Sequence, residues 1–271
     1  MINIIDTSSG FYFLSNVLLE GNFPFHLKSL NISILVPGRA NVCDQDLVHF
    51  LIQQSDSLIE LSLHCNEQTL LSLPPDSFPN LVTLGGSSLT MKYLANRPSI
   101  RELNWNSLGK PGLDLILWDE RQMQQILSPI ESLTIGIVPL SHPNARGRQP
   151  LSAISPYLNS LRQLILVGDF LPEDFDEIPR LPQLEYFFVA CLDKKRILPR
   201  PLQRGFVYQW FSASQTLTEV AFLKGSYGWG GNKTFRRWRR DEESGEIWRM
   251  DMGAEPKNDE TPHPILTQLG L

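Results

Sequence analysis

The chain has 271 residues, of which 42% are hydrophobic, and this is enough apolar material to form a core. Its formal net charge of -5 is small for this length and excludes binding to nucleic acid or to an anionic membrane through bulk charge. An odd number of cysteines, three, and a segment Met1 to Leu14 without the features of a secretory signal predict an intracellular protein, cytoplasmic or nuclear. We expect no membrane association, because no apolar run is long enough to span a bilayer.

A single spacing dominates the chain from Leu27 onward: an apolar residue is followed by further apolar residues three and five positions later. The copies begin at Leu27, Leu58, Leu81, Ile100, Ile130, Leu161, Leu184 and Leu217. The second copy continues to Asn66 and so completes the leucine-rich-repeat signature LxxLxLxxN. Apolar and polar residues alternate in copies such as Leu61-Ser62-Leu63 and Leu133-Thr134-Ile135, which predicts strands with one face in the core. The segments between copies are long enough to return the chain to a parallel neighbour.

Several of these return segments carry helical patterns. We expect Asp44 to cap one helix, and Ser155 to cap another in which Pro156 occupies the first turn. The apolar positions expected on the helices are Leu47, Phe50 and Leu51; Met123, Ile126, Leu127 and Ile130; and Leu202, Phe206 and Trp210.

Together these patterns predict an α/β fold, a leucine-rich-repeat solenoid shaped as a curved horseshoe. A parallel β-sheet is expected on its concave face, with helices and loops on its convex face. Residues 1–25 are expected to form an N-terminal cap segment, residues 26–225 the solenoid, and residues 226–271 a C-terminal hairpin and tail. No single repeat buries enough apolar surface to be stable alone, so stability depends on stacking.

The concave positions change in character along the series. Small polar residues occupy the first five strands, whereas the last three strands offer apolar residues. The predicted partner-binding residues are Ile165, Val167, Tyr186, Phe188, Ala221 and Leu223. Contiguous exposed apolar surface usually marks a site for a protein partner. The alternative is that the C-terminal tail folds back over these residues, which would make them ordinary core.

The C-terminal segment Lys233 to Arg240 contains five basic residues interleaved with Phe235 and Trp238. This mixture can bind single-stranded RNA by stacking and charge neutralisation. The acidic residues from Asp241 to Glu246 follow directly, so we expect a β-hairpin in which the arginines pair with these carboxylates, and we keep RNA binding as the alternative.

The repeat series from Leu27 to Leu223, together with the Trp- and Arg-rich tail from Thr234 to Trp248, resembles the C-terminal part of fungal F-box proteins of the leucine-rich-repeat type. This resemblance implies substrate recognition for a cullin-type ubiquitin ligase, reached through a small linker protein that binds the F-box. An F-box would lie before the first repeat, but Met1 to Phe25 lacks its leucine-proline start, and Leu171-Pro172-Glu173 is expected to be a crossover. The linker is therefore a partner only if an F-box is present upstream.

Motifs that carry chemistry are absent from the sequence. There is no GxSxG elbow and no CxxC pair, and the glycine-rich stretch Gly225 to Gly231 lacks the lysine of a phosphate loop. Cys65 is expected to point into the core and His64 to the opposite side, so the two do not chelate one metal. We expect no catalytic residue, cofactor or metal.

The predicted function is thus a non-enzymatic, protein-binding repeat domain that recognises substrates for an F-box-like ubiquitin ligase adaptor. A free-standing leucine-rich-repeat scaffold without a ubiquitin role is one alternative, and RNA binding through the tail is the other.

Overall fold

The computed structural model describes residues 2–6, 26–34, 45–107, 119–137, 151–168, 172–190, 200–223, 235–241 and 243–251. In this part of the chain the fold is α/β, with an open sheet of 11 strands that follow one another in sequence order. The strands are β1 (Ile2–Asp6), β2 (Ser29–Ile34), β3 (Glu60–His64), β4 (Thr83–Gly86), β5 (Glu102–Ser107), β6 (Ser132–Ile137), β7 (Gln163–Val167), β8 (Tyr186–Ala190), β9 (Glu219–Leu223), β10 (Phe235–Arg240) and β11 (Ile247–Asp251). Strands β1 to β9 are parallel, whereas β10 and β11 are antiparallel.

The eight strands expected from the repeat spacing are all present, as β2 to β9, and each begins two residues after the first apolar residue of its copy. The repeat spacing did not predict strand β1. This strand lies within residues 1–25, the segment expected to be a cap, and it pairs with β2.

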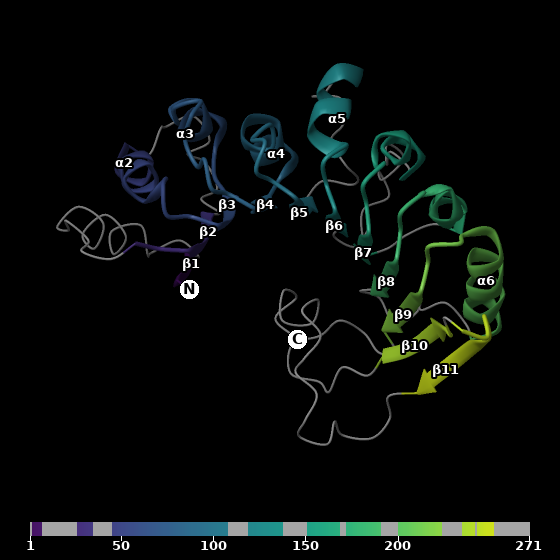
Figure 1. Ribbon diagram of the computed structural model, residues 1–271. Helices are drawn as coiled ribbons and strands as arrows, with labels where there is room; N and C mark the ends of the chain where they lie inside the picture. Colours follow the sequence, from purple (N-terminus) through teal and green to yellow (C-terminus); the bar gives the residue numbers. More distant parts are fainter. Residues whose placement is uncertain are drawn as a thin grey trace, which may run out of the picture.

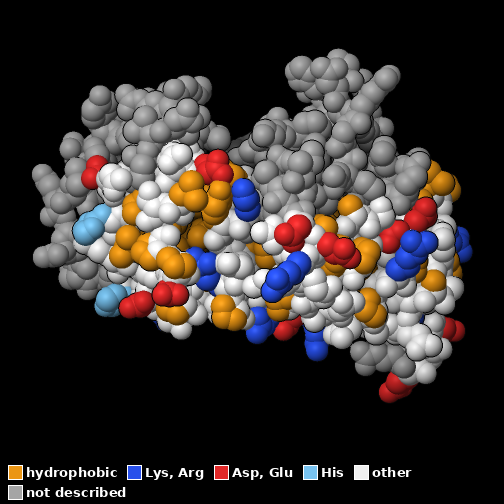
Figure 2. Space-filling model, turned by 90° about the horizontal axis from the view of Figure 1, so that it is seen from above, with side chains coloured by type: hydrophobic (Ala, Val, Ile, Leu, Met, Phe, Trp, Pro, Cys, Tyr) orange, Lys and Arg blue, Asp and Glu red, His pale blue; other side chains and the backbone are white. Residues whose placement is uncertain are grey.

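Short helices connect the strands. They are α2 (Gln45–Gln54), α3 (Glu67–Leu71), α4 (Ser88–Leu94), α5 (Glu120–Leu127) and α6 (Arg200–Ala213), with the 3-10 helices η2 (Leu151–Ala153), η3 (Ser155–Tyr157) and η4 (Pro172–Arg180). The strands follow an arc and line its inner side, and the helices lie on the outer side (Figure 1). On this outer side, hydrophobic side chains occur in small areas among charged ones (Figure 2). Among the large hydrophobic residues in the described part of the chain, Leu71 on α3 is the most exposed.

The core lies between the sheet and the helices. The residue that opens each repeat is at most 8% exposed, and the two apolar residues that follow it on β3, Leu61 and Leu63, are 1% and 0% exposed. The same alternation continues along the sheet, because the strands pair without a slip in register. One continuous core is therefore shared by all repeats.

Each strand is joined to the preceding repeat by a shared carbonyl at its entrance. The carbonyl oxygen of Lys28 accepts hydrogen bonds from the backbone amides of Ile59 (2.9 Å) and Glu60 (3.0 Å). The same pair of bonds recurs at every later parallel strand, with acceptors Ile59, Val82, Arg101, Glu131, Arg162 and Glu185. We call this series of residues the entrance row.

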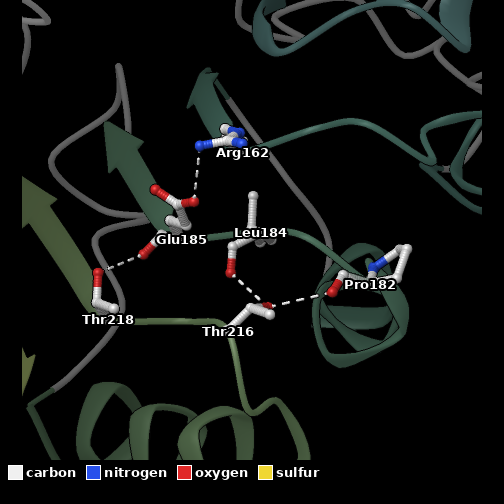
Figure 3. Close-up of polar contacts among 6 residues, drawn as sticks. All are labelled: Arg162, Pro182, Leu184, Glu185, Thr216 and Thr218. Atoms are coloured by element: carbon white, nitrogen blue, oxygen red, sulfur yellow. Dashed lines mark hydrogen bonds and ion pairs between the residues drawn. The ribbon is translucent and has the colours of Figure 1, made fainter. Parts of the chain in front are cut away.

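Side chains strengthen the entrance row near β8 (Figure 3). Arg162 pairs with Glu185 at 3.3 Å, and the hydroxyl of Thr218 donates to the carbonyl oxygen of Glu185 at 3.1 Å. The hydroxyl of Thr216 lies 3.0 Å from the carbonyl oxygen of Leu184 and 3.4 Å from that of Pro182. These hydrogen bonds satisfy backbone carbonyl groups in the bends that lead into the strands.

Two of the expected helices differ in detail from the structure. Ser155 is the first residue of η3 rather than its cap, and its hydroxyl instead donates to the carboxylate of Glu177 at 2.7 Å. On α6, Leu202 is 53% exposed, and the buried residues are Gln203, Val207, Trp210 and Phe211. With 3.6 residues per turn, Leu202 lies about 80° around the helix from Trp210, on the side away from Gln203 and Val207, and so falls outside the buried face.

The helix expected to carry Met123, Ile126, Leu127 and Ile130 is present as α5, but it ends at Leu127, so Ile130 lies beyond it. Asp119 and Gln122 form a capping box at its start. Helix α2 carries the expected Leu47, Phe50 and Leu51 in the core, while its expected cap, Asp44, lies outside the described residues. Within the described part of the chain, no helix combines the length and apolar character needed to cross a membrane.

Candidate functional site

The inner face of the sheet is built from rows of side chains that run across the strands. Because residues on a strand alternate between faces, the residues between the core positions all point to this inner side. The first row contains Ser29, Glu60, Thr83, Glu102, Ser132, Gln163, Tyr186 and Glu219. The second row contains Asn31, Ser62, Gly85, Asn104, Thr134, Ile165, Phe188 and Ala221.

Over strands β2 to β6 these rows are polar and open. Glu60 is exposed, and nearly all the other described side chains of both rows are half-exposed. Gly85 carries no side chain, and a Cβ placed there would lie 2.9 Å from the hydroxyl oxygen of Ser62. The side chain of Ser62 therefore fills the space beside Gly85, which is itself buried. We name the part of both rows on β2 to β6 the polar floor.

The prediction of binding residues from sequence passed over the polar floor, because exposed polar residues are ordinary surface content. The available signal was the smallness of the side chains at successive inner positions.

Over strands β7 to β9 the inner face is apolar and covered. Of the six predicted partner-binding residues, Ile165 is 0%, Val167 9%, Phe188 4%, Ala221 7% and Leu223 3% exposed, and Tyr186 is half-exposed. The rows bring Ile165, Phe188 and Ala221 side by side, and all six lie on the predicted face. Their burial favours the alternative in which these side chains are packed rather than offered to a partner.

Replacing Phe188 with leucine tests that packing. A buried phenylalanine loses contacts when its ring is removed, so we expect Phe188→Leu to lower the free energy of unfolding by about 1–2 kcal/mol. Chemical denaturation followed by circular dichroism measures this loss. Ser62→Ala, on the open part of the same row, is the matched control, and a loss at Phe188 no larger than that of the control would show that the ring is a free surface group.

The expected C-terminal hairpin is present as β10 and β11, and β10 also pairs with β9. The pairing of its arginines differs from the expectation. Arg237 and Arg239 lie 3.8 and 3.4 Å from the carboxylate oxygens of Glu219 on β9. The reason is register, since Arg239 lies directly opposite Glu219 across the sheet.

Asp241, the acidic residue that follows β10, accepts hydrogen bonds within the turn of the hairpin. Asp241 accepts hydrogen bonds from the backbone amide and the hydroxyl of Ser244 in the turn, and these bonds hold the pKa of Asp241 below its ordinary value.

The remaining residues of β10 hold the hairpin to the rest of the protein. Trp238 is 6% exposed within the main core, and Arg236 donates to the side chain of Gln203 at 2.6 Å. Arg240 donates to the carbonyl oxygens of Phe211, Ser214 (2.7 Å) and Gln215 (3.2 Å). Its positive charge interacts favourably with the negative C-terminal end of the α6 dipole. RNA binding through these arginines would have to compete with these contacts.

Cys65 and His64 follow the expected orientation. Cys65 is half-buried and packed against the core. His64 lies on the inner face, where burial lowers its pKa below the ordinary value and favours the neutral imidazole. Cys191 and the stretch Gly225 to Gly231 lie outside the described residues.

Within the residues that the structure describes, no group of three or more His, Cys, Asp or Glu side chains is arranged to hold a metal ion. An open depression on the outer side is lined by the start of α5 and by Tyr157. Its lining mixes Asp119, Glu120 and Arg121 with two glutamines, and it is separate from the polar floor.

Comparison of the chain with protein-family models, with curated proteins and with solved structures finds no match in any of the three. An assignment of function therefore rests on the surface chemistry described above, and the polar floor is the candidate site.

Proposed function

We propose that the chain is a leucine-rich-repeat solenoid that binds an extended segment of another protein on its polar floor and carries out no chemistry of its own. The observation that carries this proposal is the open inner face over β2 to β6, lined by small polar side chains on a rigid sheet. The leucine-rich-repeat assignment is supported by the signature from Leu58 to Asn66 and by the recurrence of one strand and one crossover per repeat.

The dimensions of the polar floor suit a short segment. Neighbouring strands lie about 4.8 Å apart, so the five strands span roughly 20 Å from β2 to β6. An extended chain of about six residues covers this distance. Serine, threonine and asparagine side chains both donate and accept hydrogen bonds, so they can pair with the backbone of the segment whatever its sequence.

Blocking the floor tests the proposal. Peptides that bind the intact chain would first be selected from a displayed library of random sequences. We expect Ser62→Arg and Asn104→Arg to weaken the selected peptides by about tenfold or more, because each long side chain occupies the floor and displaces hydrogen bonds. Isothermal titration calorimetry measures the dissociation constant, and circular dichroism confirms that each variant is folded.

The matched control is Gln68→Arg, which adds the same side chain to an exposed position of α3 on the outer side. Peptides that keep their affinity for both floor variants, or that lose it equally with Gln68→Arg, would contradict binding on the polar floor.

The resemblance to fungal F-box proteins extends the proposal, because it would make the bound segment part of a protein selected for ubiquitination. Binding of the chain to the purified cullin linker separates this role from that of a scaffold without a ubiquitin connection. Peptide binding with no linker binding would favour the scaffold.

A further inference from the structure

The charges on the polar floor have one sign. Its two ionisable acidic residues are Glu60 and Glu102, and no lysine or arginine is found among its described side chains. His64, at the edge of the floor, adds no cation near neutral pH, since its burial favours the uncharged ring. The floor is therefore an anionic surface on a chain whose net charge is also negative.

Several cations of the same repeats are engaged elsewhere. Lys92 lies 4.0 Å from Glu67 on the outer side, and Arg97 donates to the carbonyl oxygen of Ser77. Arg101, in the entrance row, donates to the carbonyl oxygens of Pro98 and Ile100. Among the described residues, none makes an ion pair with Glu60, which is exposed.

The two carboxylates stand on either side of one strand. Glu60 on β3 and Glu102 on β5 both face Thr83 on β4, so their Cα atoms are about 10 Å apart at the usual strand spacing. The hydroxyl of Thr83 donates to Glu102 at 3.0 Å and fixes that carboxylate toward the middle strand. Next to Thr83 on the same face, Gly85 carries no side chain, and the side chain of Ser62 occupies the space beside it.

We propose that the segment bound on the polar floor carries a lysine or arginine whose side chain lies across β4 and whose cation is held between Glu60 and Glu102. This inference rests on the proposed function and adds the chemical class of the partner: an extended, basic segment of a protein. A cation shared by two carboxylates makes charge-assisted hydrogen bonds, which are stronger than those between neutral groups. Complementary charge also orients the segment and rejects acidic competitors.

The test uses the displayed library of random peptides and the full chain. Selection on the intact chain is expected to enrich lysine or arginine at one position, and the selected peptides should bind about tenfold or more weakly to the Glu60→Gln, Glu102→Gln double variant. Their affinity should fall as the salt concentration rises. On a Glu60→Lys, Glu102→Lys variant, selection should instead enrich aspartate or glutamate at that position.

Glu120→Gln, an exposed change at the start of α5, is the matched control and should leave affinity unchanged. Peptides without a basic preference that still lose binding with Ser62→Arg would overturn this inference and leave the polar floor as the binding site. Peptides indifferent to every floor variant would overturn both the inference and the proposed function.

Discussion

Replacing Trp210 with alanine is expected to lower the free energy of unfolding by about 3–5 kcal/mol. The indole is 1% exposed in the core beneath α6. Its ring packs against Phe175, Phe187, Phe206 and Phe222, with centroids 5.1 to 6.2 Å away. Its Nε1 also donates to the carbonyl oxygen of Phe175 at 3.2 Å. Alanine would leave a cavity and remove this hydrogen bond, and the two losses act together.

Urea denaturation followed by circular dichroism measures this loss. Tyr208→Ala removes an aromatic ring from the same helix at a position that is 41% exposed, so it should cost less than about 1 kcal/mol. Trp210→Phe keeps a ring but removes the donor, and an intermediate loss is expected. Equal losses for Trp210→Ala and Tyr208→Ala would show that the aromatic cluster does not stabilise this end of the sheet.

The second large effect is expected at Gly86, the last residue of β4. Its φ is 153°, and a Cβ there would lie 2.5 Å from the carbonyl oxygen of Leu63 and 2.7 Å from the Cβ of Thr90. Neither neighbour can move easily, because Thr90 is 0% exposed and its hydroxyl donates to the same carbonyl at 2.7 Å. Gly86→Ala should therefore combine backbone strain with overpacking and cost about 2–5 kcal/mol.

Two other glycines provide controls by the same denaturation measurement. Gly85→Ala meets chiefly the side chain of Ser62, which can rotate, so a smaller loss is expected. Gly205 lies inside α6 with nothing within 4 Å of an added Cβ, and Gly205→Ala should stabilise the protein by about 0.5–1 kcal/mol. If Gly86→Ala behaved like Gly85→Ala, the close approach of Gly86 to Leu63 would be refuted.

The sequence was sufficient to place eight of the nine parallel strands, β2 to β9, because their signal is local. The spacing of Leu58, Leu61 and Leu63 indicates which side chains of one repeat face the core. The same spacing in the other repeats gives the eight strand positions. Helix faces were harder to predict. The buried face of α6 is selected by its neighbours, including Arg236, which meets Gln203 from a strand far along the chain.

For the candidate site, the sequence predicted which residues share a face but not which of them are exposed. Periodicity assigned Ile165 and Phe188 to the inner face, but it could not tell whether that face is covered, since covering depends on long-range packing. For the same reason the arginines of β10 were expected to pair with the acidic residues next to them in sequence, whereas Glu219 is their partner across the sheet. The polar floor was correctly described as polar, yet its openness required the three-dimensional structure.

The entrance row also constrains how such a chain can grow or shrink. Each shared carbonyl requires two consecutive amides from the next repeat, so losing one residue at Glu131 or Ser132 would displace the inner side chains of β6 to the wrong face. The crossovers have no such requirement, and successive repeats begin as few as 19 residues apart, from Leu81 to Ile100, and as many as 33, from Leu184 to Leu217. Length variation is thus confined to the outer arc, and the inner face can be extended only by whole repeats, each of which contributes one more strand to it.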